Sequence, residues 1–293
     1  MGGVAREAPE GARSLDRVGI AGIGLIGGSL ALALRRARPG IRMVGVDRGP
    51  ALERAAALGV FDVVDTDVGA LAGADLVVLA APVRQNAELL RSLPPVLTAS
   101  VLVTDTGSTK RAVIEAARGL PPHISFVGGH PLAGSAQGGA TAARPGLFEG
   151  RRWLLTPGPA TRSPGDVEAL AGLVTLCGAT PHVMDAAAHD RIVAALSHLP
   201  QLTASALMQV VGDTVGGDNL ALAGPGLADA TRLAASPPAI WQDICATNAD
   251  AIAPLIEALI ETLQRLRDDL PHGEVITEVF TSAREWRGKI EGS

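Results

Sequence analysis

Two segments carry side chains suited to proton transfer, and each follows an apolar run that predicts a buried strand. DTGSTK at 105–110 includes Ser108, whose hydroxyl can either cap the helix that follows or face a ligand. GGHPLAGS at 128–135 places His130 between two turns, and an imidazole with a pKa of about 6.5 can accept a proton near neutral pH. A lone histidine is more often structural. Because His130 lies at the carboxyl edge of a sheet that is expected to bind a dinucleotide, we interpret it as a general base.

A glycine-rich turn directly after the first predicted strand indicates that dinucleotide site. Its sequence, GIGLIG at 22–27, fits the GxGxxG pattern and opens a predicted helix. Gly22 permits the tight turn, Gly24 lets the backbone approach a pyrophosphate, and Gly27 lets helix and strand pack closely. Leu25 and Ile26 lie between Gly24 and Gly27, at the N-terminus of the helix, where the negative charge of a phosphate is stabilised. The alternative is that the glycines only shape a turn, and the flanking strand and helix argue against it.

Further residues near this turn favour NAD over NADP. Asp47 ends the second predicted strand, 20 residues after Gly27, where a carboxylate can accept hydrogen bonds from the ribose hydroxyls and repels a 2′-phosphate. The adjacent Arg48 can stack on adenine or partly offset that repulsion. Ala81 and Pro82 follow the strand predicted at 74–80 and are expected to line the cofactor, although an ordinary turn would have the same sequence.

The elements that must position these residues alternate between strands and helices up to about residue 184. Strands are predicted at 18–21, 42–46, 74–80, 101–104, 124–127 and 153–156, and helices at 28–38 and 51–58. This α/β order predicts a Rossmann-type, doubly wound parallel sheet. Helical spacing follows at 186–195, 199–211, 227–234, 238–248 and 251–270. We expect a disordered leader at 1–16, a dinucleotide-binding domain at 17–184 and an all-helical domain at 185–293.

Composition excludes several classes of protein. The 293 residues allow about two domains, and 25 basic against 30 acidic residues give a net charge of −5, which argues against a nucleic-acid partner and favours a small molecule. Residues 18–34 carry no charge, but their glycines argue against a membrane segment. Cys177 and Cys245 lie far apart, and the histidines show no ligand spacing, so we expect no disulfide, no metal and a cytoplasmic location.

Six motifs occur in the order in which they are found in the prephenate and arogenate dehydrogenases of tyrosine biosynthesis, and the chain resembles that family over nearly its whole length. The motifs are GIGLIGGSL at 22–30, DTGSTK at 105–110, GGHPLAGS at 128–135, LFEGRRWLLTP at 147–157, HDRIVAALSHLPQ at 189–201 and DATRLAASPPAIWQDI at 229–244. The resemblance implies NAD-dependent oxidative decarboxylation of prephenate to 4-hydroxyphenylpyruvate. It also implies a homodimer formed by the helical domain, with the active site between the domains.

The resemblance assigns roles to single residues. His130 matches the histidine that takes up the proton of the C4 hydroxyl as hydride leaves ring C4, and Ser108 matches the serine that orients this hydroxyl. Arg232 matches the arginine that binds a substrate carboxylate, for which a planar guanidinium is suited. Ser197 and Ser135 are expected to face the substrate.

Several positions leave the interpretation open. Trp241 resembles the aromatic residue that the partner subunit contributes, and a packing role explains it equally well. His198 is interpreted as structural. Ala136 and Gln201 stand where many relatives have an acidic residue and a second histidine, so the polar network near Arg232 is expected to differ. These changes could alter recognition of the substrate's side chain or relax control by tyrosine.

Other functions also fit the sequence. Arogenate or 4-amino-4-deoxyprephenate could replace prephenate in the same chemistry. Another dehydrogenase with a Rossmann and a helical domain would lack the His-Pro segment, and an NAD-sensing protein without activity would not need His130, Ser108 and Arg232. We expect no feedback domain after the helices and no chorismate mutase domain before the sheet.

Overall fold

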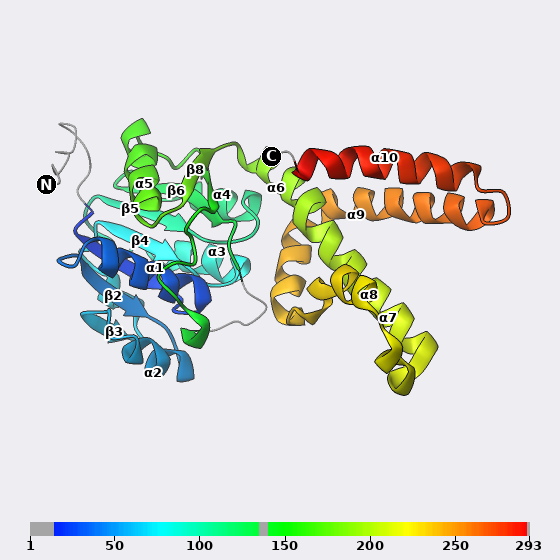
Figure 1. Cartoon of the computed structure of the whole chain (residues 1–293). Coiled ribbons are helices and arrows are strands. Elements are labelled where there is room, and N and C mark those ends of the chain that lie inside the picture. The colour runs from blue at the N-terminus through cyan, green and yellow to red at the C-terminus, as the bar shows by residue number, and fades with distance from the viewer. Residues whose placement is uncertain (1–14, 135–139, 292–293) are drawn as a thin grey trace, which may run out of the picture.

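An α/β domain lies beside a helical domain in the computed structural model, which describes residues 15–134 and 140–291 (Figure 1). One sheet with the order β3-β2-β1-β4-β5-β6-β7-β8 forms the α/β domain. Its strands are β1 (Arg17–Ala21), β2 (Arg42–Val46), β3 (Val63–Asp65), β4 (Leu76–Leu79), β5 (Val101–Asp105), β6 (Ile124–Pro131), β7 (Arg152–Pro157) and β8 (Thr180–Val183). The prediction of a doubly wound, Rossmann-type fold is confirmed. The sheet is not parallel throughout, because β7 runs antiparallel to β6 and pairs in parallel with β8.

The strand order reverses at β1, which pairs with β2 on one side and with β4 on the other. Val18 of β1 is paired with Leu76 of β4, and Ala21 with Leu79, so the two strands end side by side. Ligands of open α/β sheets bind at the carboxyl ends of strands at such a reversal. The glycine-rich turn and the loop that contains Ala81 both begin there.

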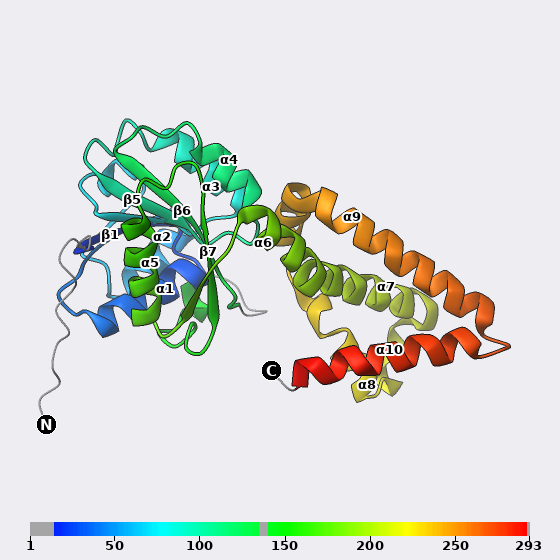
Figure 2. The same ribbon diagram turned by 90° about the horizontal axis from the view of Figure 1, so that it is seen from above.

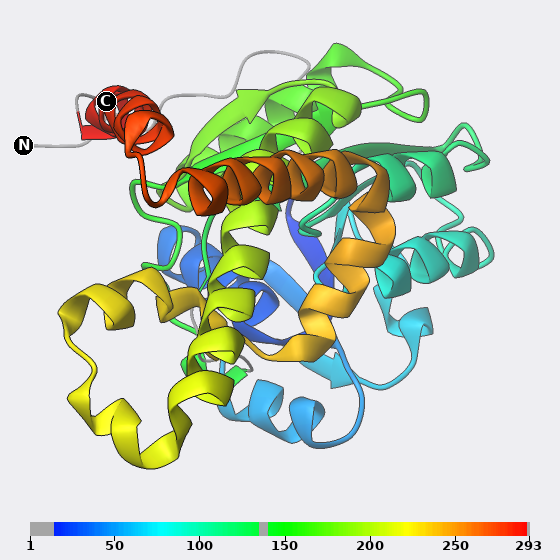
Figure 3. The ribbon, with the colours of Figure 1, turned by 90° about the vertical axis from the view of Figure 1, so that its right-hand side faces the viewer.

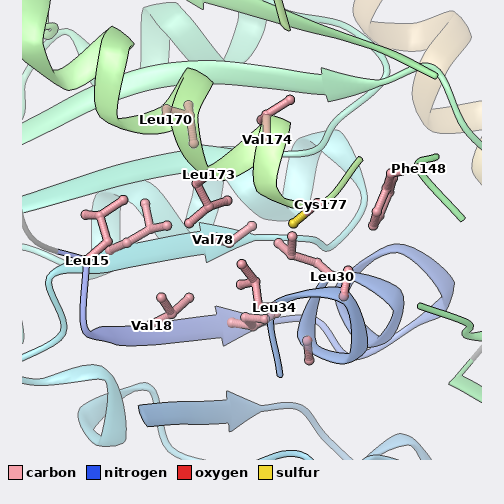
Figure 4. Close-up of a cluster of buried hydrophobic side chains, with 14 of the residues drawn as sticks. Leu15, Val18, Leu30, Leu34, Val78, Phe148, Leu170, Leu173, Val174 and Cys177 are labelled. Carbon is pink, nitrogen blue, oxygen red and sulfur yellow. The ribbon is translucent and has the colours of Figure 1, made fainter. Parts of the chain in front are cut away.

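Helices cover both faces of this sheet because alternate strand residues point to opposite sides. Leu30 and Leu34 of α1 (Leu25–Ala37) pack in one core with Val78 of β4 and with Leu170 and Val174 of α5 (Figure 4). The opposite core contains side chains of α3 and α4 together with the neighbouring strand residues. The remaining elements of this domain are α2 (Pro50–Ala57), η1 (Val68–Leu71), α3 (Val83–Ser92), α4 (Arg111–Ala117), η2 (Ala140–Ala142) and α5 (Pro164–Leu176). Each leucine buried in this way stabilises the fold by about 1.5–3 kcal/mol.

The second domain is helical, as predicted, and extends away from the sheet (Figure 2). Its elements are α6 (Ala186–Val193), the π-helical η3 (Ala194–His198), α7 (Leu199–Asn219), η4 (Leu220–Leu222), α8 (Pro225–Ala230), η5 (Arg232–Ala235), α9 (Pro238–Asp269) and α10 (Glu274–Glu291). The helices predicted at 238–248 and 251–270 form the single element α9, which is irregular at Asn248. Gly273, with φ +86°, reverses the chain between α9 and α10.

The prediction of one continuous helix at 227–234 is wrong. The segment divides into α8 and η5 at Thr231, whose hydroxyl donates to the carbonyl oxygen of Leu227 at 2.7 Å. The turn that carries Arg232 is therefore a separate short element, and its position depends on its contacts with neighbouring segments.

Residues 1–14 of the expected leader lie outside the described residues. Leu15 is buried in the core, and the backbone N–H of Asp16 donates to a carboxylate oxygen of Asp75 at 3.0 Å, so the last two residues assigned to the leader belong to the fold. The uncharged stretch at 18–34 forms β1 and α1. In the described part of the chain, no helix has the length and apolar character needed to cross a membrane.

Candidate active site between the domains

The glycine-rich turn leaves space where a phosphate group would bind. A Cβ atom on Gly27 would lie 2.0 Å from the carbonyl oxygen of Gly22, and Gly22 itself has φ +95° and lies against the backbone of Ala80, so the fold needs both glycines. A Cβ atom on Gly24 would meet no atom within 4 Å. Leu25 and Ile26 begin α1, whose first turn has neither a side-chain cap nor an acidic residue. Free N–H groups and the helix dipole at such an open turn suit a pyrophosphate.

The carboxylate of Asp47 stands beside this turn. Its Oδ2 atom accepts from the backbone N–H of Ile23 at 2.6 Å, and Oδ1 accepts from that of Arg48 at 2.7 Å. Each oxygen keeps a further lone pair for a ribose hydroxyl. The Arg48 side chain is exposed, and no hydrogen bond joins it to another described side chain.

A buried amide fixes the neighbouring loop after β4. Oδ1 of Asn86 accepts from the N–H of Ala81 at 3.0 Å, and its Nδ2 atom donates to the carbonyl oxygen of Leu79 at 3.1 Å. Pro82, which is exposed, directly precedes α3. Asn86 was not predicted from the sequence, although a polar residue four positions after a proline that follows a strand is a usable signal for a side chain that holds the loop.

His130 lies near the end of β6 and contacts a histidine from the other domain. Its Nδ1 atom is 2.9 Å from Nε2 of His189, at the centre of α6. Nδ1 of His189 in turn lies 2.8 Å from Oδ1 of Asp190. His189 and Asp190 are fully buried, whereas His130 is half-buried. A chain of hydrogen bonds therefore connects the predicted base to a buried carboxylate.

Asp190 also joins the two domains. Its carboxylate accepts from the backbone N–H groups of Lys110 at 2.7 Å and Arg111 at 3.0 Å, and from Nε of Arg111 at 3.1 Å. These bonds cap α4 from outside its own segment, so Ser108 does not cap this helix. Burial by itself would raise the pKa of Asp190, but the hydrogen bonds from His189 and from both backbone groups outweigh burial and lower it.

A buried ion pair holds the strand ends around the site. Nζ of Lys110 contacts a carboxylate oxygen of Asp105 and donates to the carbonyl oxygen of Gly129 at 2.7 Å. The other Asp105 oxygen accepts from the N–H of Gly129 at 3.1 Å. These bonds link the end of β5 to the residue that precedes His130. Burial lowers the pKa of Lys110 below its usual value, although Asp105 opposes this shift.

Two of the clustered histidines are held in the neutral form. Burial puts the pKa of His130 well below its usual value of 6.5, and the nearby charge of Lys110 adds to this shift. Burial also lowers the pKa of His198 to about 4. Nδ1 of His198 lies 3.3 Å from Nδ2 of Asn248, where it can accept a hydrogen bond. An imidazole with a lowered pKa is free to accept a proton at neutral pH.

The structure brings some of the other predicted residues to this cluster. Trp241 packs edge-on against His198, with ring centroids 6.0 Å apart, and this contact is made within one chain. Ser197 is exposed beside His198 in the π-helical turn η3, an irregularity that is frequent at functional sites. The Ser108 hydroxyl, two residues before Lys110, forms no hydrogen bond with any residue that the structure describes. Ser135 lies outside the described residues, as does Ala136.

Arg232 is exposed on η5 and forms neither a hydrogen bond nor an ion pair within residues 15–134 and 140–291. The structure gives no direct contact between its side chain and the histidine cluster. The link runs through Gln201, one turn after His198, whose Nε2 atom donates to the carbonyl oxygen of Leu233 at 2.8 Å. Seen from the side of the helical domain, α7 and α9 lie over one end of the α/β domain (Figure 3).

His189, Asp190 and Lys110 are functional candidates that reasoning from the sequence missed. All three are fully buried and polar. The signals were present, because Lys110 ends DTGSTK and His189 and Asp190 begin HDRIVAALSHLPQ, two motifs on which the resemblance already depends. Their pairing across the domain boundary is not visible in the sequence.

Comparisons with known proteins give matches over most of the chain. The family model described as "Prephenate dehydrogenase, nucleotide-binding domain" matches residues 30–183, and "Prephenate dehydrogenase, dimerization domain" matches residues 185–277. The chain is 36% identical over 283 residues to a prephenate dehydrogenase of Bacillus subtilis, covering 93% of this chain and 75% of the relative. It is 34% identical over 281 residues to a cyclohexadienyl dehydrogenase of Zymomonas mobilis, covering 92% of this chain and 94% of the relative. The solved structure of Aquifex aeolicus prephenate dehydrogenase with hydroxyphenyl propionate and NAD+ is similar with a TM-score of 0.85, at 30% identity, and the match covers 94% of this chain and 99% of the other.

Proposed function

The chain belongs to the prephenate dehydrogenase family, and we propose that it oxidatively decarboxylates prephenate with NAD, using His130 as the proton acceptor. The observation that carries this proposal is the hydrogen-bonded chain from His130 through His189 to Asp190. It lies at the same edge of the sheet as the open glycine turn, because β6 and β1 both end there. A dinucleotide site beside a proton acceptor is what dehydrogenation of an alcohol requires.

The residues around the turn fit NAD. The first-turn N–H groups of α1 at Leu25 and Ile26 would hold the pyrophosphate, for which Gly24 leaves room. Asp47 would accept hydrogen bonds from the adenosine ribose, with Arg48 beside it. Ala81 and Pro82, in the loop after β4, would line the cofactor. Bound NAD supplies the acceptor for the hydrogen and electron pair that leave ring C4.

The hydrogen-bonded chain supports a role for Nε2 of His130. The Asp190 carboxylate can only accept, so Nδ1 of His189 donates to it. Nε2 of His189 then accepts from Nδ1 of His130, an assignment that follows from the network. Nε2 of His130 keeps its lone pair and can accept a hydrogen bond from the substrate's C4 hydroxyl.

The proton then moves in step with the electrons. As hydrogen leaves C4 with its electron pair, the C4–O bond gains carbonyl character and the hydroxyl proton moves towards His130. Cleavage of the bond to the ring carboxylate releases carbon dioxide and leaves that electron pair in the ring. The ring becomes aromatic, and the oxygen takes the proton back as the phenol hydroxyl of 4-hydroxyphenylpyruvate.

Other residues would orient the substrate. Ser108 is suited to hydrogen-bond the C4 hydroxyl, since its own hydroxyl has no partner among the described residues. Ser197 and Trp241 lie next to His198, and Ser135 is proposed from the sequence as a further substrate contact. Arg232 would bind a carboxylate of the substrate, and its charge is not neutralised by any described residue.

Arogenate is the second candidate substrate, since the Zymomonas mobilis relative is named for cyclohexadienyl compounds in general. Arogenate, prephenate and 4-amino-4-deoxyprephenate share the ring that becomes aromatic. The proposed proton acceptor serves the first two in the same way, because both carry a C4 hydroxyl.

We propose that the protein works as a homodimer through its helical domain. Large apolar side chains on these helices are exposed by more than half, a pattern that indicates a covered surface. They include Val210 of α7, Leu222 of η4, and Phe280, Trp286 and Ile290 of α10. A second copy of the chain fits, because the matching family model describes a dimerization domain. We also place the protein in the cytoplasm, since both cysteines are free thiols, as is usual in a reducing compartment.

A direct assay tests the function. The purified protein is incubated with NAD and, separately, with prephenate, arogenate and 4-amino-4-deoxyprephenate, and NADH absorbance and carbon dioxide release are followed together. With prephenate, we expect NADH and carbon dioxide to form in equal amounts. A folded protein that binds NAD but turns over none of the three would instead be a sensor.

A further inference from the structure

Gln201 is a buried amide in α7 whose polar atoms are directed to another segment of the helical domain. Nε2 donates to the carbonyl oxygen of Leu233 at 2.8 Å and to the hydroxyl of Ser205, one turn along α7, at 3.3 Å. Oε1 accepts from the hydroxyl of Ser236 at 3.1 Å. The residue is only 4% exposed, so the side chain has little access to solvent. Both hydrogens of the amide nitrogen are therefore used within the protein.

Two of these three bonds hold the short turn η5, one at Leu233 within it and one at Ser236 directly after it. Leu233 directly follows Arg232, and Ser236 directly follows the end of η5. In the described part of the chain, no other hydrogen bond joins α7 to this segment. Because η5 has only four residues and Arg232 itself has no partner among the described residues, the direction of the guanidinium depends on how the turn is held.

We propose that Gln201 is a positioning residue that fixes the Arg232 turn and thereby determines affinity for the substrate's carboxylate. This proposal rests on the carboxylate-binding role proposed above for Arg232. Gln201 acts through η5 and does not bind substrate with its amide nitrogen, since both N–H groups are already used. The arrangement also uses the chemistry of an amide, which can donate to a carbonyl and accept from a hydroxyl at the same time. An uncharged clamp holds the turn in the same way at every pH at which the protein is folded.

Gln201→Met tests this role, because methionine has nearly the same length and apolar packing but cannot form these hydrogen bonds. We expect the KM for prephenate to rise about tenfold, as loss of two buried hydrogen bonds would give. The kcat value and the KM for NAD should stay within about twofold of the unchanged protein, since neither depends on η5. Ser205→Ala is the matched control. It removes only the bond within α7 and should change none of the three constants.

Combination with Arg232→Gln separates positioning from general damage. If Gln201 acts through Arg232, Gln201→Met should raise KM no further in the Arg232→Gln background. The same tenfold rise in both backgrounds, or no rise in the single variant, would overturn the proposal. If Arg232→Gln alone leaves KM unchanged, the role of Arg232 fails, and this inference fails with it, while turnover by the unchanged protein would still support the proposed function.

Folding is checked by the thermal unfolding midpoint and by NAD affinity. Should Gln201→Met fail to fold, Ser236→Ala removes one of the two bonds to the turn from the opposite side. We expect it to raise the KM for prephenate about threefold with kcat unchanged. An unchanged KM in Ser236→Ala would then count against the proposal.

Discussion

Nδ1 of His130 lies 2.9 Å from Nε2 of His189, so one hydrogen bond connects the end of β6 in the α/β domain to α6 in the helical domain. Asp190, the next residue, makes a second connection to the N-terminus of α4. The proposed proton acceptor is therefore oriented by the same contacts that dock the two domains. The cofactor turn is built by the α/β domain alone, so loss of the domain contacts should impair the chemistry more than the binding of NAD.

His130→Asn should lower kcat about 10²–10⁴-fold, because it removes the general base. Affinity for NAD should change less than about twofold, since no described contact joins His130 to the glycine turn. Steady-state kinetics with prephenate and a calorimetric titration with NAD measure the two quantities. His182→Asn, an exposed histidine on β8, is the control and should match the unchanged protein. An equal loss of turnover and of NAD affinity would mean that His130 is structural.

The pH dependence of kcat/KM should show an acid limb below pH 6.5. Burial, with the nearby charge of Lys110, lowers the pKa of His130, so the imidazole is neutral and able to accept a proton at neutral pH. Activity should fall only as the pH drops through this lowered pKa, when the imidazole becomes protonated. The rate profile between pH 5 and 8 measures this. An acid limb centred above pH 7 would contradict the assignment of His130 as the base.

Asp190→Asn should destabilise the protein and lower its kcat. The buried carboxylate accepts four hydrogen bonds through its two oxygens, and an uncharged amide with one acceptor oxygen cannot satisfy both Arg111 and His189. We expect a loss on the order of 3 kcal/mol in the free energy of unfolding at pH 7, measured by urea titration. Because the folded protein lowers the pKa of Asp190, this contribution is present above about pH 4 and is lost as the pH falls through the lowered value.

Asp250→Asn is the matched control for that change. Asp250 also pairs with Arg111, at 2.6 Å, but its side chain is 68% exposed. Removal of an exposed ion pair should cost less than about 1 kcal/mol and leave kcat unchanged. Equal effects of the two variants would show that burial of Asp190 has no special importance.

Much of the fold was predictable because its strands are continuous apolar runs. The strand predicted at 42–46 is β2, and the strands predicted at 101–104 and 124–127 lie within β5 and β6. The short strands β3 and β8 were missed, since neither contains a fully buried residue or a long apolar run. α5 was missed although Ser163 and Asp166 form a capping box at its start, a local signal that could have been used. α10 was also missed, because charged residues interrupt its apolar positions.

The site was predictable where one segment carries its own geometry. The glycine turn requires only strand, turn and helix, and it lies where the sequence placed it. The partners of His130 were not predictable in this way, since His189 is 59 residues away and its side chain meets His130 only after the domains dock. Similarly, Gln201 stands out in the sequence because many relatives have a histidine there. The sequence does not indicate that its amide forms hydrogen bonds with Leu233 and Ser236, which follow Arg232.

Gly24→Ala should weaken NAD binding without changing stability. A Cβ atom at this position meets no protein atom within 4 Å, so the fold can accept it, but the methyl group would enter the space proposed for the pyrophosphate. We expect the KM for NAD to rise at least about tenfold, while the thermal unfolding midpoint moves by less than about 2 °C. Gly40→Ala is the control, because its Cβ atom also meets no neighbour but lies outside the turn. Unchanged NAD binding in Gly24→Ala would mean that the cofactor does not lie against this glycine.

Arg232→Gln should raise the KM for prephenate and leave the chemical step nearly intact. A guanidinium that binds a carboxylate through two charge-assisted hydrogen bonds contributes about 1.5–3 kcal/mol, which corresponds to a rise in KM of roughly 10- to 100-fold. The kcat value should change by less than about threefold, because the proton acceptor, His130, is untouched. Arg267→Gln, which removes an exposed guanidinium from the same domain, should have no effect on either constant. A loss confined to kcat, with KM unchanged, would place Arg232 outside the carboxylate site.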